Sequence, residues 1–122
     1  MRARVFLAFL ALGAAAPGAR AQAAPSLVGR WSWEALVDTE AVADGTIDVR
    51  RAHSGALSGV AVFGGDQRPV RVLAVQGRSF RLEMVMPDGA VPVEGTLLDD
   101  GTISGTWGYG ECSGRFTARR GR

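Results

Sequence analysis

The chain has 122 residues, enough for one domain and too few for two domains with separate cores. All 14 basic residues are arginine, and a single cysteine and a single histidine exclude an internal disulfide framework and the Cys/His clusters of structural zinc sites. The formal net charge is +2, but part of the positive charge lies in the N-terminal segment.

Residues 1–21 have the pattern of a secretory signal peptide. A short basic start, Met1–Arg4, precedes an uncharged run at 5–16 that is dominated by Ala, Leu and Phe. Small residues then offer cleavage near 21–24. The apolar run is shorter than the roughly 20 residues that a membrane-spanning helix needs. We therefore expect export, to the periplasm or out of the cell, and no membrane span after cleavage.

Cleavage would change the charge of the protein. It removes Arg2, Arg4 and Arg20, which leaves 11 of the 14 arginines against 12 acidic residues and a net charge near −1. Nucleic acid is therefore not an expected partner. The mature chain would begin with a short Ala/Pro tether at 22–26, followed by one domain at 27–120.

That domain shows apolar and polar residues alternating with period two, interrupted by turn residues at short intervals, and no helical period. The pattern predicts eight strands, at 27–37, 46–52, 56–63, 69–76, 79–86, 91–98, 102–109 and 114–120. Only the connection at 38–44 is expected to be longer, with room for a helical turn.

Short connections rich in Asp-Gly and Gly-x pairs favour tight hairpins between antiparallel neighbours. An open meander would expose two edge strands, and closure removes both. The predicted fold is thus all-β, a single small antiparallel up-and-down β-barrel of about eight strands. A partial repeat between 57–64 and 103–110 places Gly59 and Gly105 on the inner face, either to admit a bulky neighbour or to let a strand bend.

A meander places alternate loops at opposite ends of the barrel. The loops of one end contain many acidic residues and only one basic residue, Arg68. We call these acidic residues the acidic rim: Asp38, Glu40, Asp44, Asp66, Asp88 and Glu111. Ordinary turn chemistry is the alternative explanation, because Asp is favoured in turns. Several large inward residues lie near the same end, and these are the candidate ligand-binding residues: Trp33, Phe63, Met84, Trp107, Tyr109 and Phe116. An eight-stranded barrel can hold one small ligand or be filled by its side chains, so a plain core is the alternative.

No catalytic motif is found, and we expect no enzyme activity, no cofactor and no metal site. Cys112 and His53 are the one pair that could form a nucleophilic couple. The meander separates them by about 15–20 Å, the length of a tilted strand, whereas a hydrogen bond needs about 3 Å. An intermolecular disulfide or a reactive thiol remains open for Cys112, but we favour a buried, inert thiol.

Apolar residues are also predicted on the outer face. The interface candidates are Val60, Val62, Leu73, Val75 and Val85. Such a patch indicates contact with a second copy or another envelope protein. The alternative is that the inner and outer faces are exchanged on the third and fourth strands, where both faces are apolar.

The sequence Gly29-Arg30-Trp31 on the first strand resembles the calycins, which include lipocalins and avidins. In lipocalins this Trp plugs the closed end of the barrel and an Arg of the last strand packs across it. The resemblance implies that role for Trp31 and Arg120, as a cation–π pair. The stretch at 102–107 also looks like avidin strands. The chain departs from lipocalins in its length and in lacking their long mouth loop and flanking helix, and the polar residues with which avidins hold biotin are not identifiable.

Two functions follow as hypotheses. The first is an exported, non-catalytic barrel that binds a small apolar ligand and repels anions with its acidic rim. The second is a protein-interaction module of the cell envelope, such as a homo-oligomeric partner or a protease inhibitor. Bacterial metalloprotease inhibitors are similar small exported barrels that insert an N-terminal segment, here 22–26, although the disulfide usual in that family is impossible with one cysteine.

Overall fold

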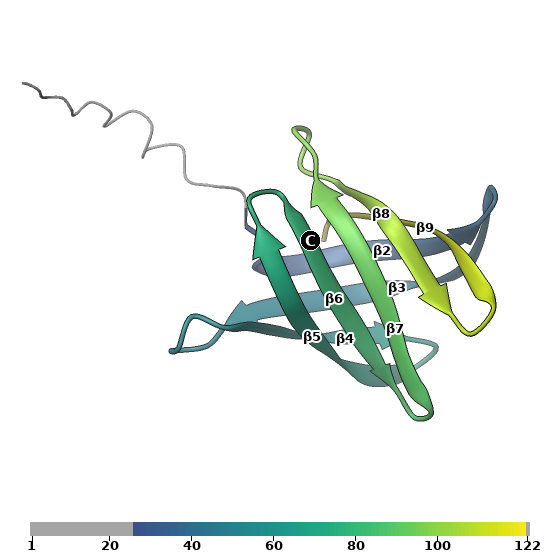
Figure 1. The fold of residues 1–122 in the computed structure, drawn as a ribbon, viewed down its shortest axis with the longest axis horizontal. Helices are drawn as coiled ribbons and strands as arrows, with labels where there is room; N and C mark the ends of the chain where they lie inside the picture. Colours follow the sequence, from purple (N-terminus) through teal and green to yellow (C-terminus); the bar gives the residue numbers. More distant parts are fainter. Residues whose placement is uncertain (1–25, 122) are drawn as a thin grey trace, which may run out of the picture.

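The computed structural model describes residues 26–121, which form eight strands and no helix (Figure 1). The strands are β2 Gly29–Val37, β3 Glu40–Arg51, β4 Leu57–Phe63, β5 Asp66–Gln76, β6 Ser79–Met86, β7 Gly89–Leu97, β8 Ile103–Tyr109 and β9 Cys112–Arg120. No helix in this part of the chain is long and apolar enough to cross a membrane.

Each strand pairs antiparallel with its neighbour in the sequence, and β9 returns to pair with β2, so that the sheet is a closed barrel. In Figure 1, β5 to β8 run obliquely across β2 to β4, which lie behind them. The predicted all-β, eight-stranded up-and-down barrel is confirmed. The predicted signal peptide at 1–21 and all of the tether except Ser26 lie outside the described residues.

The connection predicted at 38–44 is corrected. Only Asp38 and Thr39 form the turn, and β3 begins at Glu40. Asp38 adopts a left-handed conformation (φ 56°), which lets a two-residue turn reverse the chain without glycine. A bulge beside Ala35 absorbs Val42 as an extra residue and restores the inward alternation.

The strands β5, β7 and β9 also begin two or three residues earlier than predicted, because their turns are tighter. Gly64 and Gly65 alone connect β4 to β5, with φ values of 60° and 82°, as a two-residue hairpin turn requires. The first strand begins later than predicted, at Gly29; residues 26–28 are not part of a strand, although Leu27 is buried in the core.

The inner face forms one hydrophobic core. Its buried members are Leu27, Trp31, Trp33, Ala35, Ile47, Val49, Ala61, Val70, Phe80, Leu82, Met84, Val93, Leu97, Ile103, Phe116 and Ala118. Gly59 pairs with Val49 and Gly105 pairs with Phe116, so both glycines have the predicted inward position. A Cβ on either would collide with backbone of the neighbouring strand, so glycine at both positions permits the close approach of that backbone and does not make room for a bulky side chain. Room for a bulky neighbour is instead given by Gly95, where a Cβ would lie 2.7 Å from the Phe80 ring.

One end of the barrel, the plugged end, is closed by Trp31 and its neighbours. Trp31 is 2% exposed, and its indole N–H donates to the Leu27 carbonyl at 2.8 Å. The Arg120 guanidinium carbon lies 4.0 Å from the centroid of the Trp31 ring, so the predicted cation–π contact is present. Arg120 also donates to the Val28 and Ser26 carbonyls at 2.8 and 2.7 Å. These bonds fasten the chain preceding β2 across the end of the barrel.

Candidate functional site

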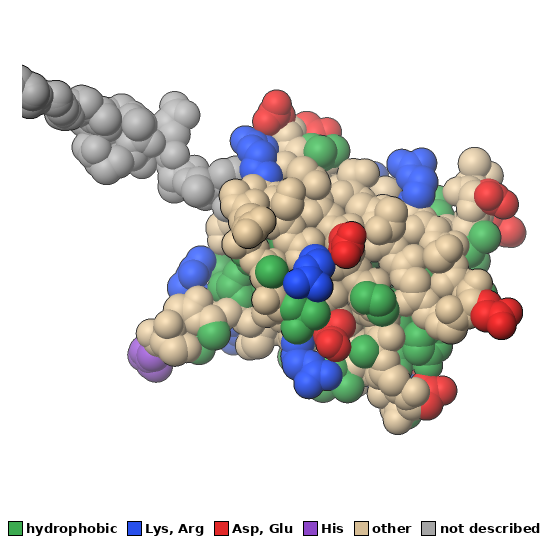
Figure 2. All heavy atoms as spheres, viewed as in Figure 1, with side chains coloured by type: hydrophobic (Ala, Val, Ile, Leu, Met, Phe, Trp, Pro, Cys, Tyr) green, Lys and Arg blue, Asp and Glu red, His purple; other side chains and the backbone are tan. Residues whose placement is uncertain are grey.

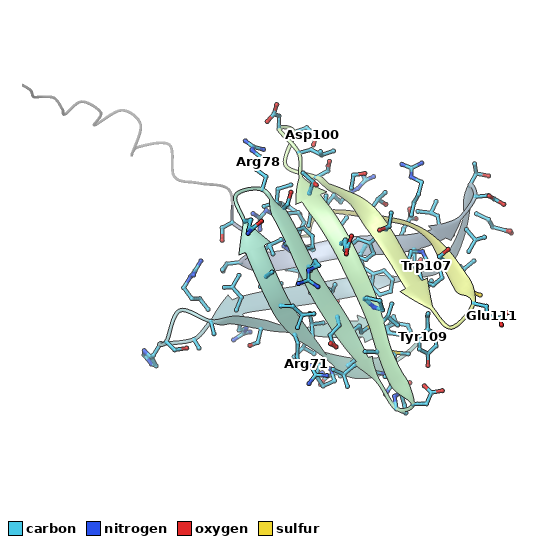
Figure 3. All side chains as sticks on the ribbon, in the orientation of Figure 1. Arg71, Arg78, Asp100, Trp107, Tyr109 and Glu111 are labelled. Atoms are coloured by element: carbon cyan, nitrogen blue, oxygen red, sulfur yellow. The ribbon has the colours of Figure 1, made fainter. Side chains whose placement is uncertain are left out.

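The opposite end of the barrel, the rim end, contains an apolar cavity of about 140 Å³, which we call the lumen pocket. Its walls are Trp33, Ala35, Val42, Ala43, Phe63, Met84, Met86, Val91, Val93, Trp107, Tyr109 and Phe116. All six predicted ligand-binding residues therefore line one cavity. Beside the plugged end, by contrast, only about 10 Å³ is free. Figure 3 labels Trp107 and Tyr109 at the rim end, away from Arg78 and Asp100 at the other end.

Three aromatic rings form one side of the lumen pocket. Trp33 stacks on Phe116 with ring centroids 5.8 Å apart and an interplanar angle of 20°. The edge-to-face contact of Trp33 with Phe63 has a centroid distance of 5.5 Å and an angle of 75°. Both are favourable aromatic geometries. They hold the Trp33 ring, only 4% exposed, in a single orientation.

Trp107 forms another wall and is fixed by a hydrogen bond that reaches over β9 to β2. Its indole N–H donates to the Leu36 carbonyl at 3.1 Å, although the two residues belong to β8 and β2. The indole passes over Gly114 of β9, where a Cβ would lie 3.1 Å from its nitrogen. Glycine at this position therefore leaves room for the indole to reach its partner.

The remaining walls are small or flexible. Ala35 and Ala43 face each other across β2 and β3, and their short side chains leave the cavity space between the larger rings. Met84 and Met86 of β6 supply unbranched side chains that adapt to the shape of a ligand. Ala43 is not among the predicted site residues, because the sequence predicts a loop at 38–44 and the structure has a strand there.

A hydrogen bond joins two neighbouring parts of the rim end. The Tyr109 hydroxyl donates to an Asp88 carboxylate oxygen, linking the end of β8 to the turn between β6 and β7. This bond raises the pKa of Tyr109, because deprotonation would place a phenolate beside a carboxylate; the cationic Arg68 opposes the effect. A raised pKa means that the bond stabilises the folded protein below the ordinary tyrosine pKa. That contribution is lost as the pH rises through the raised pKa.

Spectrophotometric titration measures this directly, because Tyr109 is the only tyrosine in the chain. The phenolate absorbance should appear with a midpoint above the ordinary value of about 10. In Asp88→Asn the midpoint should fall, since an amide leaves no charge to repel the phenolate. An unchanged midpoint in Asp88→Asn would show that the hydrogen bond does not form in solution.

The acidic rim is present with one correction. Figure 2 shows acidic side chains at the rim end, around the turns between the strands. Asp44, however, lies within β3, paired with Glu34 on the outer face, because that strand extends further than predicted. Arg68 pairs with Ala61 on the inner face, and its guanidinium lies 3.3 Å from the Asp66 carboxylate.

Two larger hollows lie on the outside of the barrel. One, of about 630 Å³, follows the outer faces of β2, β3, β8 and β9, and the other, of about 490 Å³, follows those of β5 to β8. Both hollows result from the curvature of the sheet, and their surfaces consist mainly of outward-facing polar residues. Within residues 26–121 no group of three or more His, Cys, Asp and Glu side chains could hold a metal ion.

Cys112 and His53 lie at opposite ends of the barrel. His53 is in the connection between β3 and β4, and Cys112 begins β9 after the turn from β8. The prediction of a buried Cys112 is wrong: the thiol is exposed, because the tight turn places it at the tip of a hairpin. It pairs with Tyr109 at the rim.

The predicted interface residues lie at the surface to different degrees. Val60 and Val62 are 42% and 37% exposed on the outer face of β4, and Val85 of β6 is half-buried. Leu73 and Val75 are exposed, but a bulge after Val72 places Val75 opposite the core residue Phe80. Val75 therefore does not continue the outward row of Val60 and Val62.

No protein-family model, curated protein or solved structure matches the chain.

Proposed function

We propose that this protein is an exported, non-catalytic, calycin-like barrel that binds a small apolar ligand in the lumen pocket. The observation that carries the proposal is the contrast between the two ends of the lumen. About 140 Å³ is free among apolar side chains at the rim end, and about 10 Å³ at the plugged end. Packed interiors leave few voids larger than a water molecule, so a cavity of this size at one end favours binding over a plain core.

The size of the cavity limits the ligand. Apolar cavities of about 150 Å³ stay dry and accept benzene, whereas pockets for drug-sized molecules span about 300–1,000 Å³. The ligand is therefore a compact, single-ring molecule. Acidic groups at the rim, including Asp66 and Asp88, favour a neutral ligand over an anion.

The calycin-like assignment is supported by the plugged end. The Gly29-Arg30-Trp31 sequence begins the first strand, and Arg120 of the last strand stacks on Trp31. The proposed export depends on residues 1–21, which lie outside the described part of the chain. The separation of His53 from Cys112 by the length of the barrel supports a role without catalysis.

Methyl NMR of labelled methionine tests ligand binding. Met1, Met84 and Met86 are the only methionines in the chain, and the last two line the lumen pocket. Addition of α-methylstyrene, a neutral single-ring hydrocarbon, should shift both pocket methyl signals in a saturable manner. Benzoate, an anion of similar size, should leave them unmoved. If α-methylstyrene shifted neither signal up to its solubility limit, the lumen would be a packed core and the proposal would fail.

A second candidate function is a protein-interaction module, favoured by the exposure of Val60 and Val62 on neighbouring outward positions of β4. Its partner would be a second copy of the chain or another envelope protein. Sedimentation of the wild type and Val62→Asp tests the first of these. A wild-type dimer that Val62→Asp converts to a monomer would support self-association, and a monomeric wild type would exclude it.

A further inference from the structure

We infer that the tip of the β6–β7 hairpin is a flap that opens to admit the ligand to the lumen pocket, and that the hydrogen bond from Tyr109 to Asp88 holds it closed. The flap consists of residues 86–91, and two of its side chains, Met86 and Val91, are walls of the pocket. The inference rests on the proposed function and adds to it the route by which a ligand reaches that site.

A ligand in the lumen pocket has to pass the side chains near the rim. Trp33, Met84 and Phe116 are only 2–4% exposed, so a ring that contacts them lies deep in the barrel. Its passage requires room between the half-buried walls nearer the rim, of which Met86 and Val91 belong to the flap. Movement of the flap would supply that room.

The pairing of β7 with β8 stops short of the rim. It ends at Val93 and Trp107, although β7 begins at Gly89 and β8 continues to Tyr109. The β6–β7 and β8–β9 hairpins end at separate places (Figure 1). Residues 89–91 are therefore paired on one side only, with β6.

Pro92 accounts for this break. The Leu97 N–H donates to the Arg78 carbonyl next to β6, and the Leu98 N–H donates to the Thr102 carbonyl next to β8. Because successive residues of a strand face alternate neighbours, the even-numbered residues of β7 face β8. Pro92 is one of them, and proline has no N–H to donate to the opposite carbonyl. The ladder therefore cannot continue toward the rim.

A second proline frees the other edge of the flap. Pairing between β5 and β6 ends at Val70 and Met84, so the next position places Pro69 opposite Val85. The even-numbered residues of β6 pair with the residues of β7 that face them, which leaves the odd-numbered ones facing β5. Val85 therefore faces a residue that has no N–H to donate. Beyond the two prolines, no residue of the flap is paired with β5 or β8.

One side-chain hydrogen bond joins the flap to the rest of the barrel. Among residues 26–121, the bond from the Tyr109 hydroxyl to Asp88 is the only hydrogen bond between a flap side chain and a neighbouring strand. Figure 3 shows Tyr109 between the end of β8 and the β6–β7 hairpin. Tyr109 is itself a wall of the pocket. Without this bond, only the packing of apolar side chains would keep the flap against the barrel.

The exchange rates of α-methylstyrene test the role of this bond. At partial saturation, the line shapes of the Met84 and Met86 methyl signals give its association and dissociation rates. In Asp88→Ala and in Tyr109→Phe both rates should rise by the same factor, about two- to tenfold, the range for loss of one hydrogen bond. The factor is common to both rates because the bond closes the flap in the free and in the bound protein. The double variant should be no faster than either single variant, since both remove the same bond.

Two further variants serve as controls. Asp100→Ala removes a carboxylate that also accepts a hydroxyl bond, from Thr102 at 2.6 Å, but at the plugged end of the barrel. Its rates should equal those of the wild type. Pro92→Val supplies the missing N–H at an exposed position and should slow both rates, because the ladder with β8 can then continue. If Pro92→Val does not fold, the variants of Asp88 and Tyr109 decide alone.

The outcomes separate the inference from the function beneath it. If α-methylstyrene exchanged at the wild-type rates in Asp88→Ala and Tyr109→Phe, the ligand would enter by another route, and the inference would be wrong while the pocket remained. Rate increases that multiply in the double variant would mean that the two residues act separately, which would also overturn the inference. If α-methylstyrene shifted neither methyl signal of the wild type, both the inference and the proposed function would be wrong.

Discussion

Replacing Ala43 by leucine is expected to weaken binding of α-methylstyrene by at least about tenfold, or about 1.4 kcal/mol. Ala43 lies on the inner face of β3 opposite Ala35 and lines the lumen pocket. An isobutyl side chain there would occupy the space that a ring needs. Because it fills an existing void and displaces no packed atom, the variant should keep its stability or gain slightly. Loss of binding without loss of stability is the result that distinguishes a ligand site from a defect in packing.

Ala41→Leu is the matched control for this experiment. Ala41 belongs to the same strand but pairs with Leu36 and is exposed, so its side chain lies outside the lumen. Binding in Ala41→Leu should equal that of the wild type, as the methionine methyl titration would show. Unchanged binding in Ala43→Leu would mean that the probe binds elsewhere on the protein.

Trp31→Ala should have the largest effect on stability, lowering the free energy of unfolding by about 3–5 kcal/mol. The side chain is among the largest fully buried in the described part of the chain. It contacts the Arg120 guanidinium and donates to Leu27, so its loss removes both the plug and the anchor of the chain before β2. Equilibrium unfolding in urea measures the change.

Variants of the two arginines at the end of β9 provide the comparison. Arg120→Ala should lower the free energy of unfolding by about 2 kcal/mol, through loss of the cation–π contact and the bonds to Ser26 and Val28. Arg119→Ala removes an exposed, outward side chain and should change the free energy of unfolding by less than about 0.5 kcal/mol. If both variants lowered the free energy of unfolding equally, Arg120 would not help to close the end of the barrel.

The barrel could be predicted because its determinants are local. Alternation with period two assigns Trp31, Trp33 and Ala35 to one face without knowledge of any partner strand, and short glycine-rich turns leave few topologies besides a meander. Once the order of the strands and the inward or outward face of each residue are known, closure of the barrel brings the first and last strands together. The pairing of Trp31 with Arg120 follows from that closure.

Features that depend on single backbone angles or bulges could not be predicted. Asp38 adopts a left-handed conformation that glycine usually signals, so the sequence predicts a longer loop after β2 and does not place Ala43 on a strand. The bulge after Val72 changes the face of Val75, and period-two alternation carries no sign of it. The exposure of Cys112 follows from a turn two residues shorter than predicted, since β9 begins at Cys112 and not at 114.

The candidate site was predicted as a set of residues but not as a chemical environment. Inward parity near one end collected the six large side chains around the lumen pocket. Whether an indole N–H finds a carbonyl depends on the relative position of distant strands, as the bond from Trp107 to Leu36 shows. The unpartnered nitrogen of Trp33 therefore becomes visible only in three dimensions.

A native mass spectrum of the protein purified gently from its own cells tests most directly whether the lumen carries a ligand. We expect a non-covalent adduct on the wild type, of a mass that fits a cavity of about 140 Å³, and none on Ala43→Leu. The released molecule should be a compact, neutral ring compound. A wild-type protein that carries no adduct, above all as a dimer, would contradict ligand carriage and direct attention to the outer face of β4.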